Sequence, residues 1–339
     1  MVGIAPGIDA DDMHAPAETA VDPNPASRRR YLTAFVVMVV VLVIVLAMLP
    51  AAISSMIGDL RGEGNDQAYD LFTGAPVDHD APIPDNITFV NIAITSLNEA
   101  NGTATLILSG HRTCPTPCPP FQATFYSLGN DAARRHGLPP SATVDVPADP
   151  GSYTFAIDLP LHGTSQNYPF DKYTLTLGVV IALQLPNGAE QLINSREVLL
   201  HSAMVTLEDR VARLNMNPPQ TIDPATARAP GDPFAFLVVD QLTWERPLHL
   251  RILAALLVVL ITVSGIFALG LRSLHELVLG IGGIILGIWG VRSIVVQSQL
   301  PDVTLIDLVL GFVILLLLVG LAIRATAYFY VKSGLRLRK

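Results

Sequence analysis

The sequence predicts a membrane protein in which four transmembrane helices, one N-terminal and three C-terminal, carry an exported all-β, sandwich-like domain. The first supporting observation is composition: 50% of the residues are hydrophobic and only 15% are charged, whereas a soluble domain usually has about 25% charged residues. The second is that apolar residues are concentrated in four long runs. The third is that hydrophobicity alternates with a period of two between residues 85 and 244, which is typical of half-buried strands.

The four apolar runs have the length of membrane-spanning helices. They are residues 31–53, 250–271, 277–296 and 303–323. A hydrocarbon core about 30 Å thick needs about 20 helical residues to cross it. We therefore expect one transmembrane helix at 28–54 and a three-helix transmembrane unit at 249–331.

A cleaved signal peptide is the alternative interpretation of the first run. Residues 27–32 resemble a twin-arginine export signal, and Ala51 and Ala52 are suited to precede a cleavage site. The apolar core of a signal peptide is usually 7–15 residues long, however, and this run is longer and strongly apolar. The run therefore favours a retained anchor.

Basic residues set the expected orientation, because cytoplasmic loops carry an excess of Lys and Arg. Arg28–Arg30 precede the first span, Arg272 lies between the second and third, and a basic tail at 332–339 follows the fourth. We therefore expect a multi-pass protein of the cell (plasma or inner) membrane with both termini cytoplasmic. Residues 1–27 are rich in Ala, Pro and Asp and are expected to form a disordered cytoplasmic tail.

The exported segment is acidic. Residues 55–248 contain 21 Asp and Glu against 10 Lys and Arg, a net charge of −11. Nucleic-acid binding depends on basic residues that neutralise phosphates, so this charge argues against it. The expected partners are the lipid bilayer and a protein partner or a second copy of the chain.

Within the exported domain, at 85–248, segments of alternating hydrophobicity are separated by turn sequences. The alternating segments begin at Val90, Ala104, Tyr153, Tyr173, Val198 and Phe234. The turn sequences are Asn101-Gly102, Asp149-Pro150-Gly151 and Pro186-Asn187-Gly188. Several short strands punctuated in this way favour a β-sandwich. Residues 55–84 and 211–232 are expected to be a linker and a loop.

The two cysteines, Cys114 and Cys118, lie close together in a Pro-rich segment. Outside the cytoplasm we expect them to form a disulfide. The alternative adds His111, which gives three possible soft ligands for copper or zinc. A closed site needs a fourth ligand and none lies nearby in sequence, so no metal or cofactor is predicted.

Tyr168-Pro169-Phe170-Asp171 precedes the longest alternating segment. One interpretation is structural: the proline fixes φ, the aromatics anchor the end of the sandwich, and Asp171 caps the turn through its own backbone amides. The other is a coupling turn at the membrane-facing end of the domain that contacts the helices.

This turn resembles the Phe-Pro-x-Asp loop of Cys-loop pentameric ligand-gated channels, in which a β-sandwich precedes four helices. The likeness covers four residues. Those channels place all four spans after the sandwich, and Cys114 and Cys118 are too close together to be their disulfide loop.

The order of one span, an exported β domain with this turn and then three spans is similar to that of an uncharacterised family of bacterial membrane proteins, known only as a domain of unknown function. Residues 287–293, Gly-Ile-Trp-Gly-Val-Arg-Ser, also resemble that family. The likeness covers most of the chain and implies no activity.

Four glycines in the third run are expected to lie on one face of a helix: Gly280, Gly283, Gly287 and Gly290. Gly283-x-x-x-Gly287 is a small-residue pattern that lets helices approach closely in lipid. We expect this face to pack against the second or fourth span, or against a copy of the chain.

Arg292 and Asp307 are charges inside the third and fourth spans. A charge at the bilayer centre costs at least about 2.5 kcal/mol. Because the two helices form a hairpin, the residues lie at similar depth. Arg292 either extends alone to the outer interface or pairs with Asp307, and an ion or proton pathway is the third possibility.

These observations favour a non-enzymatic membrane protein whose exported domain binds a partner or ligand, as an accessory subunit of an envelope assembly. The sequence has no nucleophile elbow, His-Glu-x-x-His, Walker loop or dinucleotide-binding glycine motif in a suitable place. The alternative is a ligand-gated channel or transporter, although the second span offers only Thr262 and Ser264 as polar residues in its middle.

Overall fold

The structure is a computed structural model. It describes residues 25–61, 67–77, 88–112, 120–129, 139–148, 151–185, 187–193, 203–224, 236–271, 274–295 and 303–332. The chain divides at Ile44 into two units, which are described separately. The predicted disulfide between Cys114 and Cys118 lies outside the described residues, as do residues 1–24 of the predicted tail and the tail from 333 onward.

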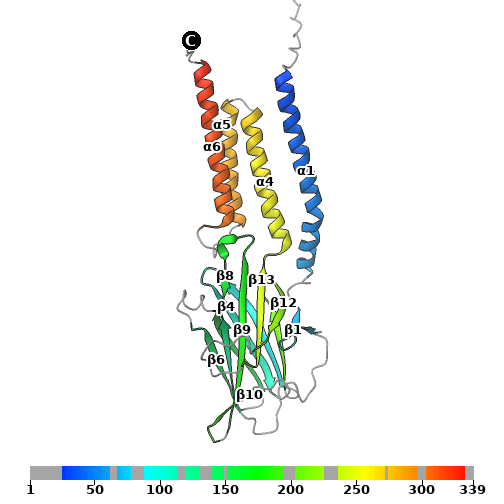
Figure 1. The fold of residues 1–339 in the computed structure, drawn as a ribbon, viewed down its shortest axis with the longest axis vertical. Helices are drawn as coiled ribbons and strands as arrows, with labels where there is room; N and C mark the ends of the chain where they lie inside the picture. The colour runs from blue at the N-terminus through cyan, green and yellow to red at the C-terminus, as the bar shows by residue number, and fades with distance from the viewer. Residues whose placement is uncertain are drawn as a thin grey trace, which may run out of the picture. The chain divides into compact units, whose positions relative to one another are not determined.

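Four α-helices are present in the described part of the chain: α1 (Pro25–Leu60), α4 (Leu248–Leu271), α5 (Leu274–Val295) and α6 (Leu305–Lys332) (Figure 1). Three of them contain apolar stretches long enough to cross a membrane, at Phe35–Leu60, Leu248–Leu269 and Leu305–Tyr330. The apolar stretch of α5 is shorter, at His275–Gly290. Three long apolar helices, one N-terminal and two C-terminal, indicate a multi-pass membrane protein.

Helices α4, α5 and α6 pack against one another in every pairwise combination. One buried cluster includes Leu277 and Ile281 of α5 with Val313 and Leu317 of α6. Glycines at two positions allow α4 and α6 to approach closely. A Cβ on Gly265 of α4 would lie 2.5 Å from Leu317, and one on Gly320 of α6 would lie 2.7 Å from Leu269.

The glycines of α5 lie elsewhere. A Cβ added to Gly283 or Gly287 would meet no other atom within 4 Å, and Gly290 is exposed while Gly280 is half-buried. The expected packing of this face against the second or fourth span therefore does not hold for Gly283 and Gly287. Packing of this face against a second copy stays a prediction.

Replacing Gly320 with Leu is expected to destabilise the helical unit by about 2 kcal/mol, because the side chain would overlap Leu269 in a packed contact. Gly287→Leu is the matched control, since it adds the same side chain where space is open, and we expect little change. Thermal unfolding of the detergent-solubilised protein, followed by helical circular dichroism, measures both. An equal loss in the control would show that the α5 glycine face is packed after all.

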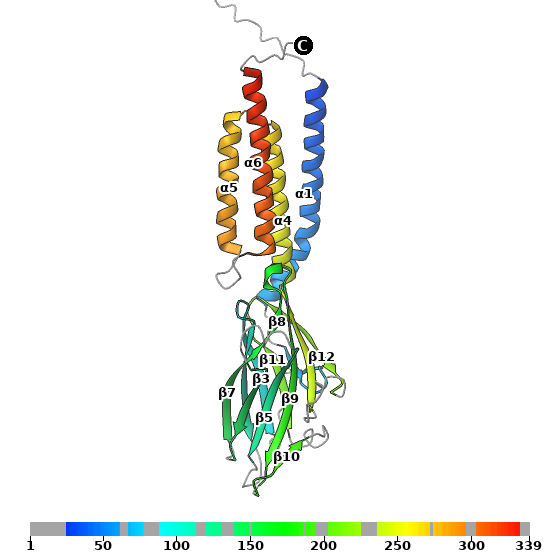
Figure 2. The same cartoon turned by 60° about the vertical axis from the view of Figure 1, so that its left-hand side comes forward.

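The β domain consists of two sheets, which confirms the predicted all-β domain (Figure 2). The six-stranded sheet has the order β2-β1-β11-β3-β4-β7, and the other has the order β12-β13-β9-β5-β6, with β8 and β10 also pairing β9. The pair β3 and β11 is parallel, and the other pairs are antiparallel. The strands are β1 (Ala68–Asp70), β2 (Pro76–Val77), β3 (Thr88–Asn98), β4 (Thr103–Arg112), β5 (Phe121–Leu128), β6 (Ser141–Val146), β7 (Gly151–Pro160), β8 (His162–Gly163), β9 (Lys172–Gln184), β10 (Glu190–Ile193), β11 (Ala203–Asp209), β12 (Asn215–Ile222) and β13 (Val238–Glu245).

One hydrophobic core contains side chains from both sheets. In β4, Ala104, Leu106 and Leu108 are buried, and the residues between them are only partly buried. In β9, Tyr173, Leu175 and Leu177 alternate in the same way. These are the period-two patterns visible in the sequence, and each places every second side chain in the space between the sheets.

Two segments predicted to lack regular structure contain strands. Residues 55–84 were predicted to be a linker, but α1 extends to Leu60 and strands β1 and β2 follow. Residues 211–232 were predicted to be a loop, but they contain β12. Strand β12 includes Pro218 and Pro219, which cannot donate to a ladder, and its pairing with β13 shifts register there. Two prolines and a bulge conceal the strand pattern in the sequence.

Candidate functional site

The candidate site lies at the junction between the last strand and the first C-terminal helix. Strand β13 ends at Glu245, α4 begins at Leu248, and only Arg246 and Pro247 connect them. The Arg246 side chain is almost fully buried, with 1% of its surface exposed. A buried guanidinium needs anionic partners, because its transfer out of water is otherwise very costly.

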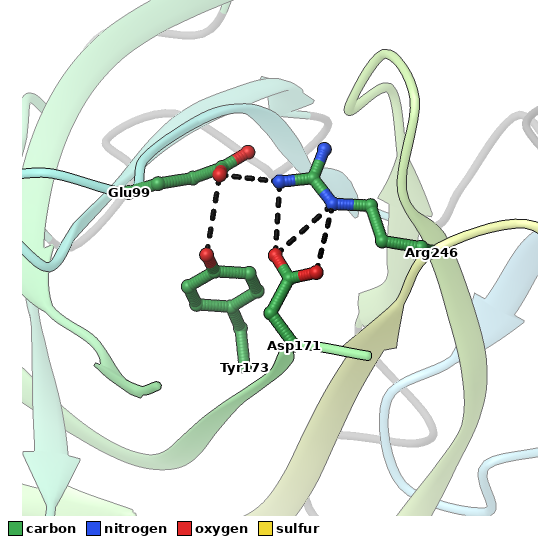
Figure 3. A network of polar contacts seen from close by, with 4 residues as sticks. All are labelled: Glu99, Asp171, Tyr173 and Arg246. Carbon is green, nitrogen blue, oxygen red and sulfur yellow. Dashed lines mark hydrogen bonds and ion pairs between the residues drawn. The ribbon is translucent and has the colours of Figure 1, made fainter. Parts of the chain in front are cut away.

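Asp171 supplies the first partner. Arg246 donates from Nε to both carboxylate oxygens, at 3.2 and 3.0 Å, and from Nη2 to Oδ2 at 2.9 Å (Figure 3). The carboxylate of Asp171 is itself fully buried. The structural interpretation of the turn gave Asp171 the role of capping its own backbone amides. The carboxylate instead binds the arginine that leads into α4.

Glu99 supplies the second partner. It lies in the tight turn between β3 and β4, and its Oε2 accepts a hydrogen bond from Arg246 Nη2 and a second, of 3.2 Å, from the Tyr173 hydroxyl (Figure 3). Gly163 of β8 leaves room for Tyr173, because a Cβ there would lie 2.2 Å from the tyrosine ring. Two segments of the β domain, the β3–β4 turn and the start of β9, therefore meet at the guanidinium that a third segment carries.

The electrostatics of this cluster leave it with one carboxylate more than it has cations when all three groups are ionised. Burial raises the pKa of Glu99, although the charge of Arg246 acts to lower it. Burial lowers the pKa of Arg246, but the hydrogen bonds that it donates to Asp171 and the charges of Asp171 and Glu99 outweigh this effect, so the pKa of Arg246 is raised. Arg246 is therefore firmly cationic, and Glu99 binds a proton more readily than an exposed glutamate does.

Tyr168 links the cluster to the helices. The Arg246 guanidinium carbon lies 5.1 Å from the centre of the Tyr168 ring, within the range of a cation–π contact. Tyr168 also belongs to a buried cluster with Ala254 of α4, Ile288 of α5, and Ile306 and Leu310 of α6. The short helix η1 (Ser165–Asn167), directly before Tyr168, contacts α6. One aromatic ring thus belongs both to the buried ion cluster and to a cluster with all three helices.

Further polar contacts join α4 to neighbouring elements. Arg251 of α4 pairs with Glu245 of β13 at 2.8 Å, and Lys172 of β9 lies 3.5 Å from the same carboxylate. His249 lies 3.5 Å from Asp59 near the end of α1, and its backbone N–H donates to the Ser55 hydroxyl at 3.3 Å. The first turn of α4 is therefore held on the β domain and on the last turns of α1.

Arg292 and Asp307 form an ion pair between α5 and α6, with Nε and Oδ1 2.5 Å apart. Asp307 Oδ2 also accepts hydrogen bonds from the backbone N–H and the hydroxyl of Thr304, at 3.0 and 2.9 Å. Thr304 precedes α6 and Asp307 is its third residue, which is the arrangement of a helix capping box. The acid therefore has a second role that the sequence analysis did not assign to it, at the start of α6.

The structure brings Tyr168 and Asp171 into the candidate site and places Phe170 at its exposed edge. Arg292, Asp307 and the α5 glycines belong to the helical unit instead. Glu99 was not singled out from the sequence, and its hairpin turn gives no signal of a buried acid. Among the described residues, no three His, Cys, Asp or Glu side chains are placed to hold a metal ion.

Comparison with known proteins gives one family match. Residues 129–230 match a family described as a domain of unknown function (DUF4436). This stretch includes the Tyr168–Asp171 turn, and both Glu99 and Arg246 lie outside it. It is also narrower than the likeness inferred from the order of spans, which extended to residues 287–293. No curated protein matches the chain.

Proposed function

We propose that this chain is a non-enzymatic multi-pass protein of the cell membrane, with an exported β domain that binds a protein partner or ligand, as an accessory subunit of an envelope assembly. The observation that carries the proposal is the Arg246 cluster. The buried cluster of Arg246 with Glu99 and Asp171 joins the β domain to its membrane helices. Such a junction is suited to transmit a displacement of the binding domain to the helices.

The proposed topology has four crossings, with both termini in the cytoplasm. Three long apolar helices support it, as does the length of α5, whose 22 residues span about 33 Å at 1.5 Å per residue. The basic segments before α1 and after α6 support the orientation. An epitope inserted at Asn187-Gly188, in the turn before β10, should be accessible in intact spheroplasts, and one at the C-terminus should not. The reverse pattern would refute the orientation.

The partner is tested with the full-length chain in its native membrane. A photoreactive phenylalanine replaces one exposed residue at a time on the β domain, at Leu192, Glu190 or Thr143, with Leu315 on α6 as a lipid-exposed control. We expect a discrete adduct in fixed ratio to the chain from at least one β-domain position. Isolation of the chain alone from all three positions would contradict the proposal.

A ligand-gated channel is the second candidate, and one observation favours it: the Tyr168–Asp171 turn contacts the helices, as the similar loop does in Cys-loop channels. The two candidates differ in a measurable way. A channel would release a trapped ion from liposomes that contain only this chain, whereas an accessory subunit would not. Sustained ion flux that Arg246→Lys alters would favour the channel.

A further inference from the structure

We infer that Phe170 inserts into the interfacial region of the outer lipid leaflet, so that the β domain rests on the bilayer as well as on its own helices. Among the described residues of the β domain, the large hydrophobic side chains that are exposed are Phe170, at 54%, and Leu192, at 39%. A single exposed apolar side chain is ordinary on a protein surface, so the position of Phe170 along the helices decides what covers it.

The turn holds Phe170 in place from both sides. Tyr168 is buried against the helices, and Asp171 is tied to Arg246 by three hydrogen bonds. The Phe170 N–H donates to the Asn167 carbonyl at 2.8 Å. The backbone position of Phe170 is therefore fixed by the turn. Tyr168 and Asp171 are held in place, and the Phe170 ring is left exposed.

The position of the turn along the helix axes indicates that Phe170 faces lipid. Tyr168 shares its buried cluster with Ile306 and Leu310, which are the second and sixth residues of α6. The apolar stretch of α6 has 26 residues, or about 39 Å, so each end extends about 4.5 Å beyond a hydrocarbon core of about 30 Å. The Tyr168–Asp171 turn lies beside the first residues of α6, and therefore at the membrane–water interface, where aromatic side chains are enriched.

The exposure of neighbouring side chains also supports a position at the lipid–water interface. Leu248 and Leu305, the first residues of α4 and α6, are exposed apolar side chains, as is Val303 just before α6. Lys172, two residues after Phe170, is exposed and carries its charge on a long apolar stem, which suits the boundary between lipid tails and headgroups. Contact with lipid explains the exposure of all these side chains without a second protein.

Leu192 provides the matched control because it is also exposed and apolar but lies near the other end of β9. It pairs with Ala182, ten residues along β9 from Lys172, which is about 33 Å at 3.3 Å per residue. The chain has two tryptophans, Trp244 and Trp289. Trp289 is exposed on α5 and is replaced by Phe, while buried Trp244 stays as a shielded reference.

In this background, Phe170→Trp and Leu192→Trp are compared in lipid vesicles, with nitroxide-labelled lipids and aqueous acrylamide as quenchers. In the Phe170→Trp variant, we expect a nitroxide near the headgroup to quench the introduced tryptophan more strongly than a nitroxide near the end of the acyl chain does. In the Leu192→Trp variant, we expect acrylamide, and not the lipids, to quench the introduced tryptophan.

Two outcomes for the Phe170→Trp variant would overturn the inference. Quenching of the introduced tryptophan by acrylamide alone would place position 170 in water. Protection from both quenchers would place it against protein.

A second measurement needs no substitution. The unmodified chain is reconstituted with a photoreactive lipid whose diazirine lies close to the headgroup, and adducts are mapped by mass spectrometry. We expect lipid adducts on the peptide containing Phe170 and none on the peptide containing Leu192. Adducts on helix peptides without any on the Phe170 peptide would overturn the inference, and this holds whether or not the β domain has a protein partner.

Discussion

Replacing Arg246 with Met is expected to lower the free energy of unfolding of the β domain by about 4 kcal/mol. The substitution keeps most of the side-chain volume but removes the guanidinium from between Glu99 and Asp171. Two carboxylates would then face each other in a buried site without a cation. The loss comes from these stranded charges rather than from lost packing, which a methionine largely replaces.

The measurement is urea unfolding in detergent micelles, followed by the emission of Trp244 in a Trp289→Phe background. Trp244 is fully buried and lies two residues before Arg246, so it reports on the affected strand. Lys172→Met is the control, because it removes a cation of which 58% of the side-chain surface is exposed and which pairs with Glu245; a change below about 1 kcal/mol is expected there. Equal effects of the two substitutions would contradict a special role for the buried cluster.

The pH dependence of the same variant separates charge from packing. Without Arg246, the charge that lowers the pKa of Glu99 is lost and burial raises that pKa further, so the folded variant binds protons at a higher pH than its unfolded chain does. Its stability therefore rises as pH falls from 7 to 5, and the gap to the wild type narrows. A loss due to packing alone would stay constant over this range.

Replacing Asp209 with Ala is expected to cost about 3 kcal/mol, because three buried donors would lose their acceptor. Asp209 Oδ1 accepts hydrogen bonds from the Val211 N–H at 3.1 Å and from the Trp244 indole N–H at 3.2 Å, and Oδ2 accepts one from the Met216 N–H at 3.1 Å. These bonds hold the end of β11, the start of β12 and the end of β13 together. Asp209→Asn keeps one acceptor oxygen and is expected to cost less.

The pH dependence of Asp209→Ala has the opposite sign. Burial raises the pKa of Asp209 to about 6, although its hydrogen bonds act to lower it. The folded wild type therefore binds more protons than the unfolded chain between about pH 4 and 6, and this stabilises it as pH falls through that window. The alanine variant has no such group, so the gap to the wild type widens on acidification. Urea titrations at pH 7 and 5 distinguish this variant from Arg246→Met; a gap that narrows for both would contradict the assignment.

Sequence patterns predicted most elements because those patterns are local. An apolar run long enough to cross a bilayer predicted α1, α4 and α6, and period-two alternation predicted β4, β7 and β9. The predictions failed where the local pattern is broken or too short. Strand β12 carries two prolines, and β1 and β2 are too short to show a period. The strands β5 and β6 were also not singled out.

The candidate site was predicted only in part. The Tyr168–Asp171 turn was recognised from its residues. Glu99 was not recognised, because a single acid in a hairpin turn looks like any solvated charge. Its burial follows from the pairing of β3 with β4 and from the position of Tyr173, and neither is encoded near residue 99.

Local sequence is enough to establish which segments are apolar enough for the membrane and which alternate as strands, since both properties depend on neighbours along the chain. The tertiary structure decided the partners. Arg246 lies 75 residues from Asp171 and 147 from Glu99. The pairing of β9 with β13 brings Asp171 to Arg246, and the packing of the second sheet adds Glu99. It also decided that Gly265 and Gly320 bring α4 and α6 into contact, while Gly283 and Gly287 face no neighbouring residue. A glycine permits close packing only where another helix faces it.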